Sequence, residues 1–519
     1  MFELEGGDRK RWEHCPLQWH LDHLQPERRT RELDSLCWEP AGFIAQAAPG
    51  SYTKLQRCPR FKSARWRSGA EIEYLQSVLP STMEEAFFDY LRTVDASEVT
   101  VSSVPEGSVV FARVPLLQVK GPLLVVQLLE TTLLCLVNYA SLVATNAARF
   151  RMLAGPDKKL MEMGLRRAQG PDGGLSASKY SYVGGFDSTS NVLAGKLFGI
   201  PVGGTVAHSY IMSFASLEEV QPRVRGPARW RRDSFRSLAR RSEGAEACLV
   251  DGGGLTLIVP RRLFQGLLDA YCVMGSGVPN FCAVALALNQ LGYRAAGVRV
   301  DSGDLGQQSR AIRRVLQTCG AAFQVPWLAT IPIAVSSDVS ERSLQELMQE
   351  GNEIDMVGIG TNLVTCPLQP SLGCVYKLVQ VNGRPTLKLT EEEEKMTVPG
   401  SKAVYRLRDA AGLAFMDLMA LETEPPPQAG REVSVRLLGW HEEARRVTPM
   451  AVETLHRTYF KDGQVCQALP SLLEIKSHVR ASLSTLSPVH KRLQEPEPYQ
   501  VAVTEKLHFL LNDLRRSSQ

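Results

Sequence analysis

The sequence predicts an α/β protein whose core is a closed or irregular α/β barrel. Between about residues 164 and 378, short runs rich in β-branched residues end in small or polar residues, and a helical pattern usually follows. This alternation is typical of a parallel sheet, and several repeats in one stretch favour a barrel. An α+β lead-in precedes this region. In such barrels the chemistry gathers at the carboxyl ends of the strands.

The individual elements are predicted in chain order. Helical spacing covers 71–79 and 84–94, strand-like alternation covers 98–119, and a long buried helix is expected over 127–153. Strand ends are expected within 201–209, 296–304, 332–338 and 355–361, and helices over 190–198, 281–293, 305–318 and 339–350.

Four segments are expected along the chain. Residues 1–66 are rich in tryptophan and arginine with little apolar periodicity, so this segment is unassigned. Residues 67–160 form the α+β lead-in and long helix, 161–380 the catalytic barrel, and 381–519 a C-terminal region. An arginine-rich stretch within 218–256 predicts a loop or insertion in the barrel. A proline-rich joint at 424–430 is expected to separate the barrel region from a tail that ends in a strand and an amphipathic helix.

Composition limits the partners. With 59 basic and 55 acidic side chains, the net charge is only +4, so no overall field draws the chain to nucleic acid. The apolar stretch 109–143 is interrupted by Arg113, Pro115, Lys120, Pro122 and Glu130, which argues against a membrane span. Eleven cysteines without a Cys-x-x-Cys pair indicate a reducing cytoplasm (cytosol). We expect a cytoplasmic protein with no nucleic acid and no membrane as partner.

His208 is the single histidine of the predicted barrel region. It follows small residues at a predicted strand end, where its side chain would face a pocket as base, nucleophile or phosphate acceptor. The alternative is a histidine whose hydrogen bonds are satisfied within the core.

A second cluster follows the next strand, where Arg299, Asp301, Ser302 and Asp304 crowd together. A guanidinium can bind a carboxylate through two parallel hydrogen bonds, and aspartates can hold Mg²⁺ or sugar hydroxyls. The alternative is an ion pair plus a helix cap, and Asp304 in particular is placed to be only that cap.

Two further strand ends carry candidates for phosphate and ribose binding. Gly358, Gly360 and Thr361 allow backbone N–H groups and a hydroxyl to approach a phosphate. Asp338 is placed to accept hydrogen bonds from ribose hydroxyls, or else to be an acid that favours a helix start.

Two polar loops complete the candidates. Arg166 and Arg167 lie beside a glycine-rich stretch and suit a diphosphate, although surface arginines are common. Ser188, Thr189, Ser190 and Asn191 lie at a helix start, which is a natural place to bind an anion, and N-capping would explain one of these residues but not all four. Fingerprints of P-loop, zincin, α/β-hydrolase and Rossmann proteins are absent from the sequence.

Together these motifs resemble the nicotinate phosphoribosyltransferase family, in its vertebrate type. The resemblance covers roughly residues 67–215 and 259–519. It rests on segments that include LLETTLLCLVNYASLVATNAAR at 128–149, EMGLRRAQGPDGG at 162–174, YVGGFDSTSNVLAG at 182–195, GGTVAHS at 203–209, GVRVDSGDL at 297–305 and VGIGTNLVTCPLQPSLG at 357–373.

The resemblance implies a type II phosphoribosyltransferase fold, an irregular α/β barrel with an α+β domain formed by the N- and C-terminal parts. It also implies a homodimer with the active site near the dimer interface. The implied reaction converts nicotinate and phosphoribosyl pyrophosphate (PRPP) to nicotinate mononucleotide and pyrophosphate, the first step of NAD synthesis from nicotinic acid. Mg²⁺ (or Mn²⁺) is the implied metal, and ATP is a co-substrate that is hydrolysed.

The resemblance also implies roles for single residues. His208 matches the histidine that ATP phosphorylates, Thr205 and Arg299 match residues at the nicotinate carboxylate, and Thr361 matches a phosphoribosyl contact. Arg166, Asp301 and Asp338 match diphosphate, metal and ribose contacts. Relatives that use nicotinamide carry an aspartate where this chain has Asn191. An aspartate would repel a carboxylate, so the acid is the expected substrate.

Two segments depart from the family. The family begins with a Thr-Asp-Leu-Tyr-Gln-x-Thr-Met motif whose tyrosine stacks on the pyridine ring, and residues 1–66 do not contain it. Residues 218–256 replace a helical stretch. The alternative function is a catalytically impaired homologue that dimerises with, or regulates, the complete enzyme.

Overall fold

A computed structural model describes residues 30–36, 43–44, 69–213, 265–290, 292–388, 397–438 and 444–517. The atypical segment 218–256, and all of 1–66 except two strands, lie outside these residues. The chain divides into two compact units, one made of Met1–Ser141 with Ser371–Gln519 and the other of Leu142–Pro370. The first unit therefore combines the two ends of the chain, as the α+β prediction required. The four-segment division within the chain stays a prediction.

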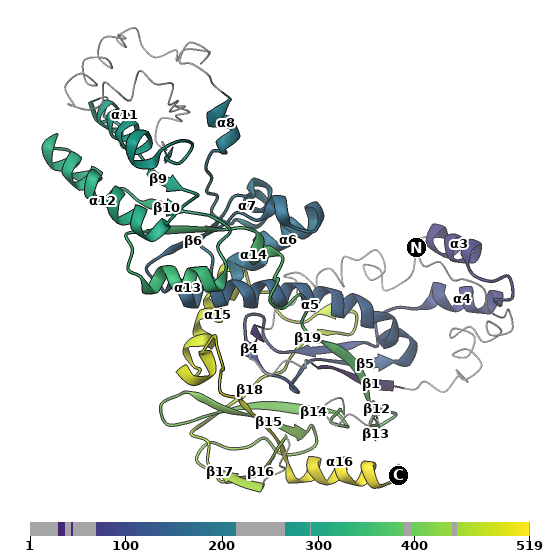
Figure 1. Cartoon of the computed structure of the whole chain (residues 1–519). Coiled ribbons are helices and arrows are strands. Elements are labelled where there is room, and N and C mark those ends of the chain that lie inside the picture. Colours follow the sequence, from purple (N-terminus) through teal and green to yellow (C-terminus); the bar gives the residue numbers. More distant parts are fainter. Residues whose placement is uncertain are drawn as a thin grey trace, which may run out of the picture. The chain divides into compact units, whose positions relative to one another are not determined.

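The second unit is built on a six-stranded sheet in which every paired neighbour is parallel. This confirms the α/β prediction. Helices α12 (Leu305–Ala322) and α13 (Glu341–Gln349) lie on one side of the strands, and α6 (Gly170–Val183) and α7 (Val192–Phe198) lie on the other (Figure 1). The strand order is β7 (Ser188–Thr189), β6 (Lys159–Glu162), β11 (Met356–Ile359), β10 (Ile333–Val335), β9 (Gly297–Val300) and β8 (Gln265–Leu267).

The central strands of this sheet are buried on both faces, which explains their continuous apolar runs. All four residues of β9 and all three of β10 are buried. Val298 and Ile333 belong to one core cluster with Phe281 of α11 (Val278–Gln290) and Leu316 of α12. Burying these side chains holds the strand ends, and so the loops that follow them, in fixed positions.

The predicted helices of this unit are present with shifted ends. Helix α12 begins at Leu305 as predicted, whereas α13 begins at Glu341, two residues late. One strand prediction was wrong: the segment before His208 forms only an isolated bridge at Val202, since its glycines have no side chains to bury. The helices are η2 (Leu165–Arg167), α6 (Gly170–Val183), α7 (Val192–Phe198), α8 (His208–Met212), η3 (Val273–Gly277), α11 (Val278–Gln290), α12 (Leu305–Ala322), η4 (Pro326–Thr330), α13 (Glu341–Gln349) and α14 (Thr361–Val364).

The first unit contains an antiparallel seven-stranded sheet. Its strand β1 comes from the segment that sequence patterns left unassigned, and it pairs on both sides, with β12 and with β5. Pairing on both edges makes β1 integral to the sheet. The order is β13 (Arg384–Pro385), β12 (Val375–Val381), β1 (Thr30–Leu36), β5 (Pro115–Pro122), β3 (Thr100–Ser103), β19 (Arg457–Lys461) and β20 (Gln464–Val465); β2 (Phe43–Ile44) pairs separately with β4 (Val109–Val110).

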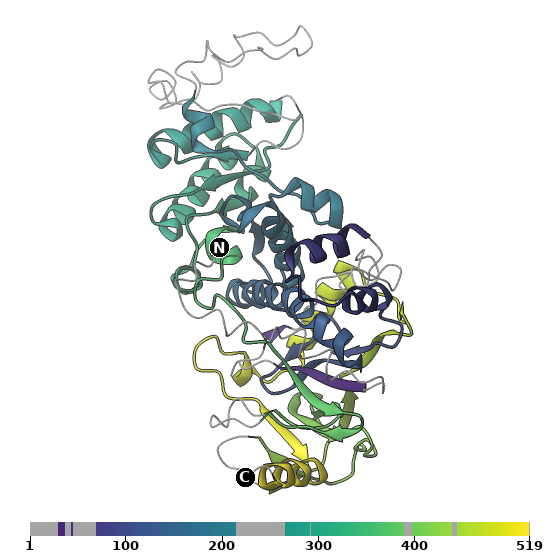
Figure 2. The same cartoon turned by 90° about the vertical axis from the view of Figure 1, so that its right-hand side faces the viewer.

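A second, six-stranded sheet in the same unit corrects one prediction. The proline-rich stretch at 424–430 connects β15 to β16, two strands of this sheet, so it is a loop and does not separate the barrel from a tail. As predicted, β21 runs directly into the C-terminal helix α16 (Figure 2). The order is β17 (Ala444–Val447), β16 (Val433–Leu437), β21 (Gln500–Thr504), β15 (Ala414–Leu421), β14 (Lys402–Arg408) and β18 (Ala451–Thr454), and the helices of the unit are α3 (Gly69–Val78), α4 (Glu85–Thr93), α15 (Leu472–Ser484), η6 (Pro488–Lys491) and α16 (Glu505–Ser517).

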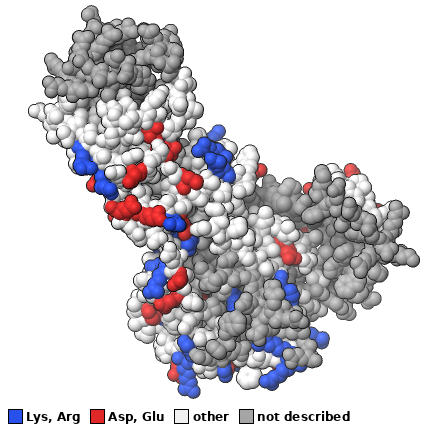
Figure 3. Space-filling model, in the orientation of Figure 1, with Lys and Arg blue, Asp and Glu red and all other residues white. Residues whose placement is uncertain are grey.

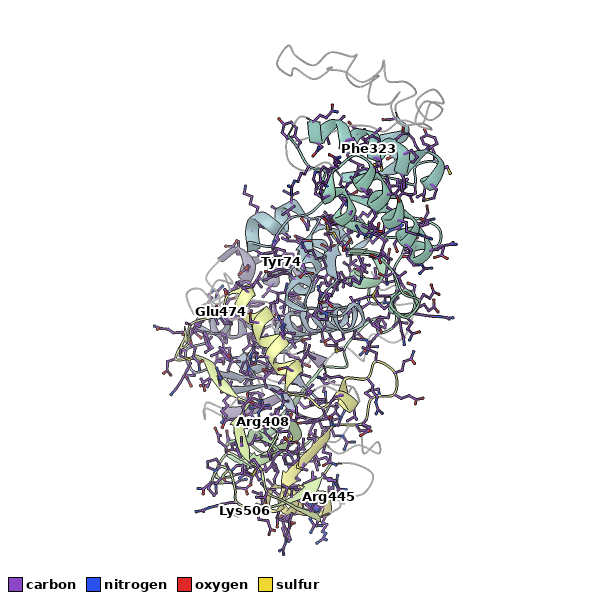
Figure 4. All side chains as sticks on the ribbon, turned by 90° about the vertical axis from the view of Figure 1, so that its left-hand side faces the viewer. Tyr74, Phe323, Arg408, Arg445, Glu474 and Lys506 are labelled. Atoms are coloured by element: carbon purple, nitrogen blue, oxygen red, sulfur yellow. The ribbon has the colours of Figure 1, made fainter. Side chains whose placement is uncertain are left out.

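Charged side chains organise this unit at two levels. Inside it, Arg406 and Asp417 form a bidentate ion pair at 2.9 and 2.8 Å, and Tyr499 donates a hydrogen bond to the same carboxylate. At its surface, Glu474 lies at the start of α15 (Figure 4), where it accepts hydrogen bonds from the backbone N–H and the hydroxyl of Ser471 in a capping box. The first arrangement pairs two buried charges, and the second gives hydrogen-bond partners to N–H groups at the start of the helix; either set left unpaired would destabilise the fold.

Helix α5 (Leu123–Ala154) contributes residues to both units. Among the described helices it alone is long and apolar enough to cross a membrane by length and composition. Four of the five residues that were expected to interrupt the apolar stretch, from Arg113 to Pro122, lie before the helix begins, so they do not interrupt it. Its later half is tied to protein by polar side chains, because Asn146 donates to the carbonyls of Asn362 and Leu363 and Arg149 pairs with Glu341 at 2.7 Å. These contacts fasten the later half of the helix to the second unit, and 39% of its apolar window is buried inside the structure.

On the face drawn in Figure 3, basic and acidic side chains of the described residues are interspersed. Pairs such as Arg342 with Glu346, at 2.9 Å within α13, place opposite charges side by side. Mixed charge of this kind follows the nearly even count of 59 basic and 55 acidic residues.

Candidate active site

The six parallel strands of the second unit all end at the same edge of the sheet, because parallel strands share one direction. Neighbouring strand ends there carry, in order across the sheet, Asn191 after β7, Arg166 after β6, Gly360 after β11, Asp338 after β10 and Asp301 after β9. The segments that the sequence singled out therefore meet along one edge. This edge is therefore the candidate active site, at the carboxyl ends of the strands, where the sequence led us to expect it.

Arg299 lies near the end of β9 and is buried, with 8% of its surface exposed. Its Nη1 donates to Oγ1 of Thr205 at 3.3 Å and to the carbonyl of Val206 at 3.0 Å. Its Nη2 pairs with Oδ1 of Asp301 at 2.9 Å, and its Nε donates to Oγ of Ser336 at 2.7 Å. The guanidinium therefore holds the Thr205 loop against β9 and β10.

His208 is the first residue of α8 and lies among carboxylates. Its Nε2 is 3.1 Å from Oδ1 of Asp269, and its Nδ1 is 3.9 Å from Oδ2 of Asp301. The imidazole and the Arg299 guanidinium thus face opposite oxygens of the same Asp301 carboxylate. The predicted convergence of His208, Arg299 and Thr205 is present in the structure.

Asp269 is a site residue that the sequence reasoning missed. It follows β8, its side chain is 1% exposed, and it accepts hydrogen bonds from the backbone N–H of Asp301 and the hydroxyl of Ser302 at 2.9 and 2.6 Å. Its one sequence signal is an aspartate directly after a short apolar run. A single aspartate in that position is too common to mark a site.

Asp338, after β10, is exposed and adopts a left-handed backbone conformation with φ of 42°. Such a conformation is uncommon for a residue other than glycine. The side-chain amide of Asn362, after β11, donates to the backbone carbonyl of Asp338 at 3.2 Å and to the carbonyl of Val339 at 3.1 Å. The β11 loop therefore holds the β10 loop in its strained form.

The loops after β6 and β11 pack closely. A Cβ on Gly164 would lie 2.4 Å from Val364 and 2.9 Å from the carbonyl of Gly360, so only glycine fits there. This packing brings the η2 turn, whose Arg166 and Arg167 are exposed, beside the loop that carries Gly360 and Thr361. Two cations beside a glycine turn suit a phosphate group.

A buried carboxylate, that of Glu162, links the loop after β6 to its neighbours by hydrogen bonds. Glu162, 1% exposed at the end of β6, accepts hydrogen bonds from the hydroxyls of Ser178 and Thr189 and from the backbone N–H of Gly164. Ser178 in turn accepts from the amide of Asn191 at 3.1 Å. Glu162 was also missed, because a single carboxylate within an apolar strand gives no pattern.

Asn191 and Ser190 differ in what they can offer a ligand. Asn191 is 4% exposed, and its Oδ1 caps α7 by accepting from the N–H of Ala194 at 3.2 Å. The neighbouring Ser190 is partly exposed, and its backbone N–H donates to the carbonyl of Glu162 at 2.8 Å. Asn191 is therefore the residue of this segment that N-capping explains.

Asp304 takes the simpler of its two predicted roles. Its Oδ1 accepts a hydrogen bond from the N–H of Gln307 at 2.8 Å, which makes it the N-cap of α12. Within the described ranges, no group of three or more His, Cys, Asp or Glu side chains is arranged to hold a metal ion. Mg²⁺ usually takes only one or two carboxylates and completes its shell with water and substrate phosphates. Asp301 Oδ2 fits that requirement.

Comparison with solved structures identifies the fold class. The crystal structure of human nicotinic acid phosphoribosyltransferase matches with a TM-score of 0.81 and 46% identity, over 96% of this chain and 98% of that one. Nicotinate-nucleotide pyrophosphorylase from Pyrococcus furiosus matches with a TM-score of 0.53 and 16% identity, over 93% and 99% of the two chains. The fold and the strand-end site define a type II phosphoribosyltransferase.

Sequence comparison identifies the family. Nicotinate phosphoribosyltransferase of Mus musculus is 54% identical over 478 residues, which cover 89% of this chain and 88% of that protein. The Caenorhabditis elegans protein of the same name is 44% identical over 485 residues, 89% and 85% of the two chains. The family models for the N-terminal and C-terminal domains of nicotinate phosphoribosyltransferase match residues 58–138 and 401–511. This chain belongs to the nicotinate phosphoribosyltransferase family.

Proposed function

We propose that this chain joins nicotinate to PRPP, releasing nicotinate mononucleotide and pyrophosphate, with hydrolysis of ATP. The observation that carries the proposal is the convergence of Arg299, Thr205, His208 and Asp301 at one end of the parallel sheet. A fixed cation, a polar loop and a phosphate-accepting imidazole are the groups that this reaction needs.

The charges of the reaction account for the two ends of the site. When pyrophosphate leaves C1 of the ribose, positive charge develops on the sugar and negative charge on the leaving group. Arg166 and Arg167 beside Gly360 and Thr361 neutralise the phosphates, and Asp338 accepts hydrogen bonds from the ribose hydroxyls. Arg299 faces the carboxylate of nicotinate, so recognition of the acid also aims the ring nitrogen at C1.

His208 has one ring nitrogen committed and one open. With Nε2 donating to Asp269, the neutral ring carries its lone pair on Nδ1. We assign Nδ1 as the atom that attacks the terminal phosphorus of ATP. A nitrogen–phosphorus bond forms, the bond between that phosphorus and the bridging oxygen breaks, and ADP leaves with the electron pair.

The metal fits the residues present. Asp301 Oδ2 would hold Mg²⁺ (or Mn²⁺) together with phosphate oxygens of the substrate. The ion supplies charge neutralisation for the departing pyrophosphate. Asp304 is used as a helix cap and is the weaker of the two predicted ligands.

We also propose that the protein acts as a homodimer in the cytoplasm. The homodimer rests on the family resemblance. The cytoplasmic location rests on the eleven cysteines without a paired Cys-x-x-Cys motif. Both stay predictions.

An assay of this exact chain tests the proposal. Purified protein incubated with nicotinate, PRPP, ATP and Mg²⁺ should form nicotinate mononucleotide, and nicotinamide in place of nicotinate should give far less product. Absence of product under conditions where the human relative is active would overturn the proposal.

The alternative is a catalytically impaired homologue that dimerises with the complete enzyme. The feature that favours it is the missing N-terminal tyrosine motif in residues 1–66. In that case the chain alone would be inactive. Added to an active relative, it would co-purify with that relative and change the relative's activity.

A further inference from the structure

The hydroxyl of Ser336 lies between the two charged side chains at the centre of the site. Ser336 follows β10 directly and is 7% exposed. Its Oγ accepts a hydrogen bond from Nε of Arg299 at 2.7 Å and donates one to Oδ1 of Asp301 at 2.6 Å. A hydroxyl has one proton and two lone pairs, so these two contacts fix the direction in which the proton points.

The two carboxylate oxygens of Asp301 make different contacts. Oδ1 receives the hydroxyl of Ser336 and the Nη2 group of Arg299. Oδ2 faces the imidazole of His208, 3.9 Å from Nδ1. Oδ2 is therefore the oxygen that remains for a metal ion, a substrate hydroxyl or a protonated histidine.

Counting the donors of Arg299 gives a matching result. A guanidinium carries five N–H groups. One from Nε is used by Ser336, Nη1 donates to Thr205 and Val206, and Nη2 pairs with Asp301. Among the described residues this leaves one N–H, on Nη2, so the carboxylate of nicotinate meets a single donor here rather than the two-pronged clamp expected from the sequence.

Arginine and aspartate have an alternative arrangement that Ser336 prevents. Without a hydroxyl between them, Nε and Nη2 of one guanidinium can grip both oxygens of one carboxylate in a fork-to-fork ion pair. Arg406 and Asp417 make that pair in the other unit of this chain. In the site, the same pairing would turn Oδ2 of Asp301 away from His208.

We propose that Ser336 is a positioning residue, which keeps Arg299 and Asp301 from forming a closed bidentate pair and so leaves one N–H and one carboxylate oxygen for the substrates. The kinetic part of this inference rests on the proposed function. The structural part does not, since it concerns only how two side chains of this protein pair.

The structural test compares crystal structures of the wild-type protein and Ser336→Ala. In the variant, Asp301 should rotate to accept from both Nε and Nη2 of Arg299, and Oδ2 should move away from Nδ1 of His208. An unchanged Asp301 in Ser336→Ala would overturn the proposal, whether or not the protein makes nicotinate mononucleotide.

The kinetic test uses Ser337→Ala as the matched control, because Ser337 is the next residue and is exposed. Loss of the two buried charge-assisted hydrogen bonds of the Ser336 hydroxyl predicts a fall of roughly tenfold or more in kcat/KM for nicotinate. The KM for PRPP should rise as well, because the rotation of Asp301 takes Oδ2 away from the metal ion that it would hold together with the substrate phosphates. Ser336→Thr, which keeps the hydroxyl, should recover most of the loss.

Two outcomes would contradict this inference in different ways. Equal kinetics for Ser336→Ala and Ser337→Ala would show that the hydroxyl does not position Arg299 or Asp301. A loss that Ser336→Thr does not recover, in step with a lower melting temperature in both variants, would show a merely structural role. A wild-type protein that makes no nicotinate mononucleotide would instead overturn the proposed function, and the two crystal structures would still decide the role of Ser336.

Discussion

Asp269 accepts the Nε2 hydrogen of His208 at 3.1 Å with one oxygen and the backbone N–H of Asp301 at 2.9 Å with the other. One buried carboxylate therefore orients the imidazole and also fixes the loop that carries its second acidic neighbour. A carboxylate in this position selects the tautomer of the histidine and stabilises the ring when it gains charge.

Replacing Asp269 with asparagine should leave the fold intact and lower the phosphorylation of His208 by ATP. The amide has no charge to support the ring, and it can turn its N–H toward Nε2. We expect a loss of about tenfold to a hundredfold in the rate of acid-labile phosphate incorporation from labelled ATP. His208→Ala should abolish that label. A label that survives in His208→Ala would rule out His208 as the acceptor.

Arg299→Ala should raise the KM for nicotinate far more than the KM for PRPP. The variant removes the cation that faces the ring carboxylate, whereas the phosphate-binding loops after β6 and β11 remain. We expect a rise of roughly tenfold to a hundredfold for nicotinate. Arg314→Ala is the control, because Arg314 is an exposed arginine of α12 that leaves the site unchanged. Equal rises in both KM values would contradict the assignment.

Asn362→Ala should weaken PRPP binding and leave nicotinate binding unchanged. The amide of Asn362 holds the strained Asp338, and without it the loop should relax toward an ordinary backbone conformation. A rise of about tenfold in the KM for PRPP is expected. Asn352 precedes β11, at the opposite end of that strand from Asn362, and its side-chain amide also donates to a backbone carbonyl, that of Leu347. Asn352→Ala is therefore the matched control. A similar effect in both variants would place the cause in general loop packing.

Acid should destabilise the fold through His456. Burial lowers the pKa of His456 to about 4, and Nδ1 has no partner among the described residues, while Nε2 donates to the carbonyl of Pro115. Between about pH 6.5 and pH 4 the unfolded chain binds a proton at this histidine and the folded chain does not. Stability therefore falls as the pH drops through that window, by on the order of 3 kcal/mol at most.

Chemical denaturation at pH 7 and pH 5 measures this effect. His456→Gln keeps an N–H donor for Pro115 and has no proton to gain, so its stability should change less between the two values. His490→Gln, at a partly exposed position of η6, serves as control and should retain the wild-type pH dependence. An identical loss in His456→Gln and the wild type would place the acid sensitivity elsewhere.

Much of the site could be predicted because its residues follow strands in a recognisable way. Arg299 and Asp301 end a short apolar run, and Gly360 and Thr361 end another, so their place at the sheet edge followed from the alternation of strands and helices. Asp269 and Ser336 could not be found in that way. A single aspartate or serine after an apolar run is common, and only its partners across the sheet distinguish it.

The sequence by itself determined the parallel sheet, its long neighbouring helix and the family, because periodicity and long motifs are local properties of the chain. Tertiary structure alone decided which polar groups pair: Asp304 caps a helix, Asp269 supports His208, and Ser336 separates Arg299 from Asp301. The reason is that a hydrogen bond depends on distances of about 3 Å between atoms from distant segments, and local pattern carries no information on those distances.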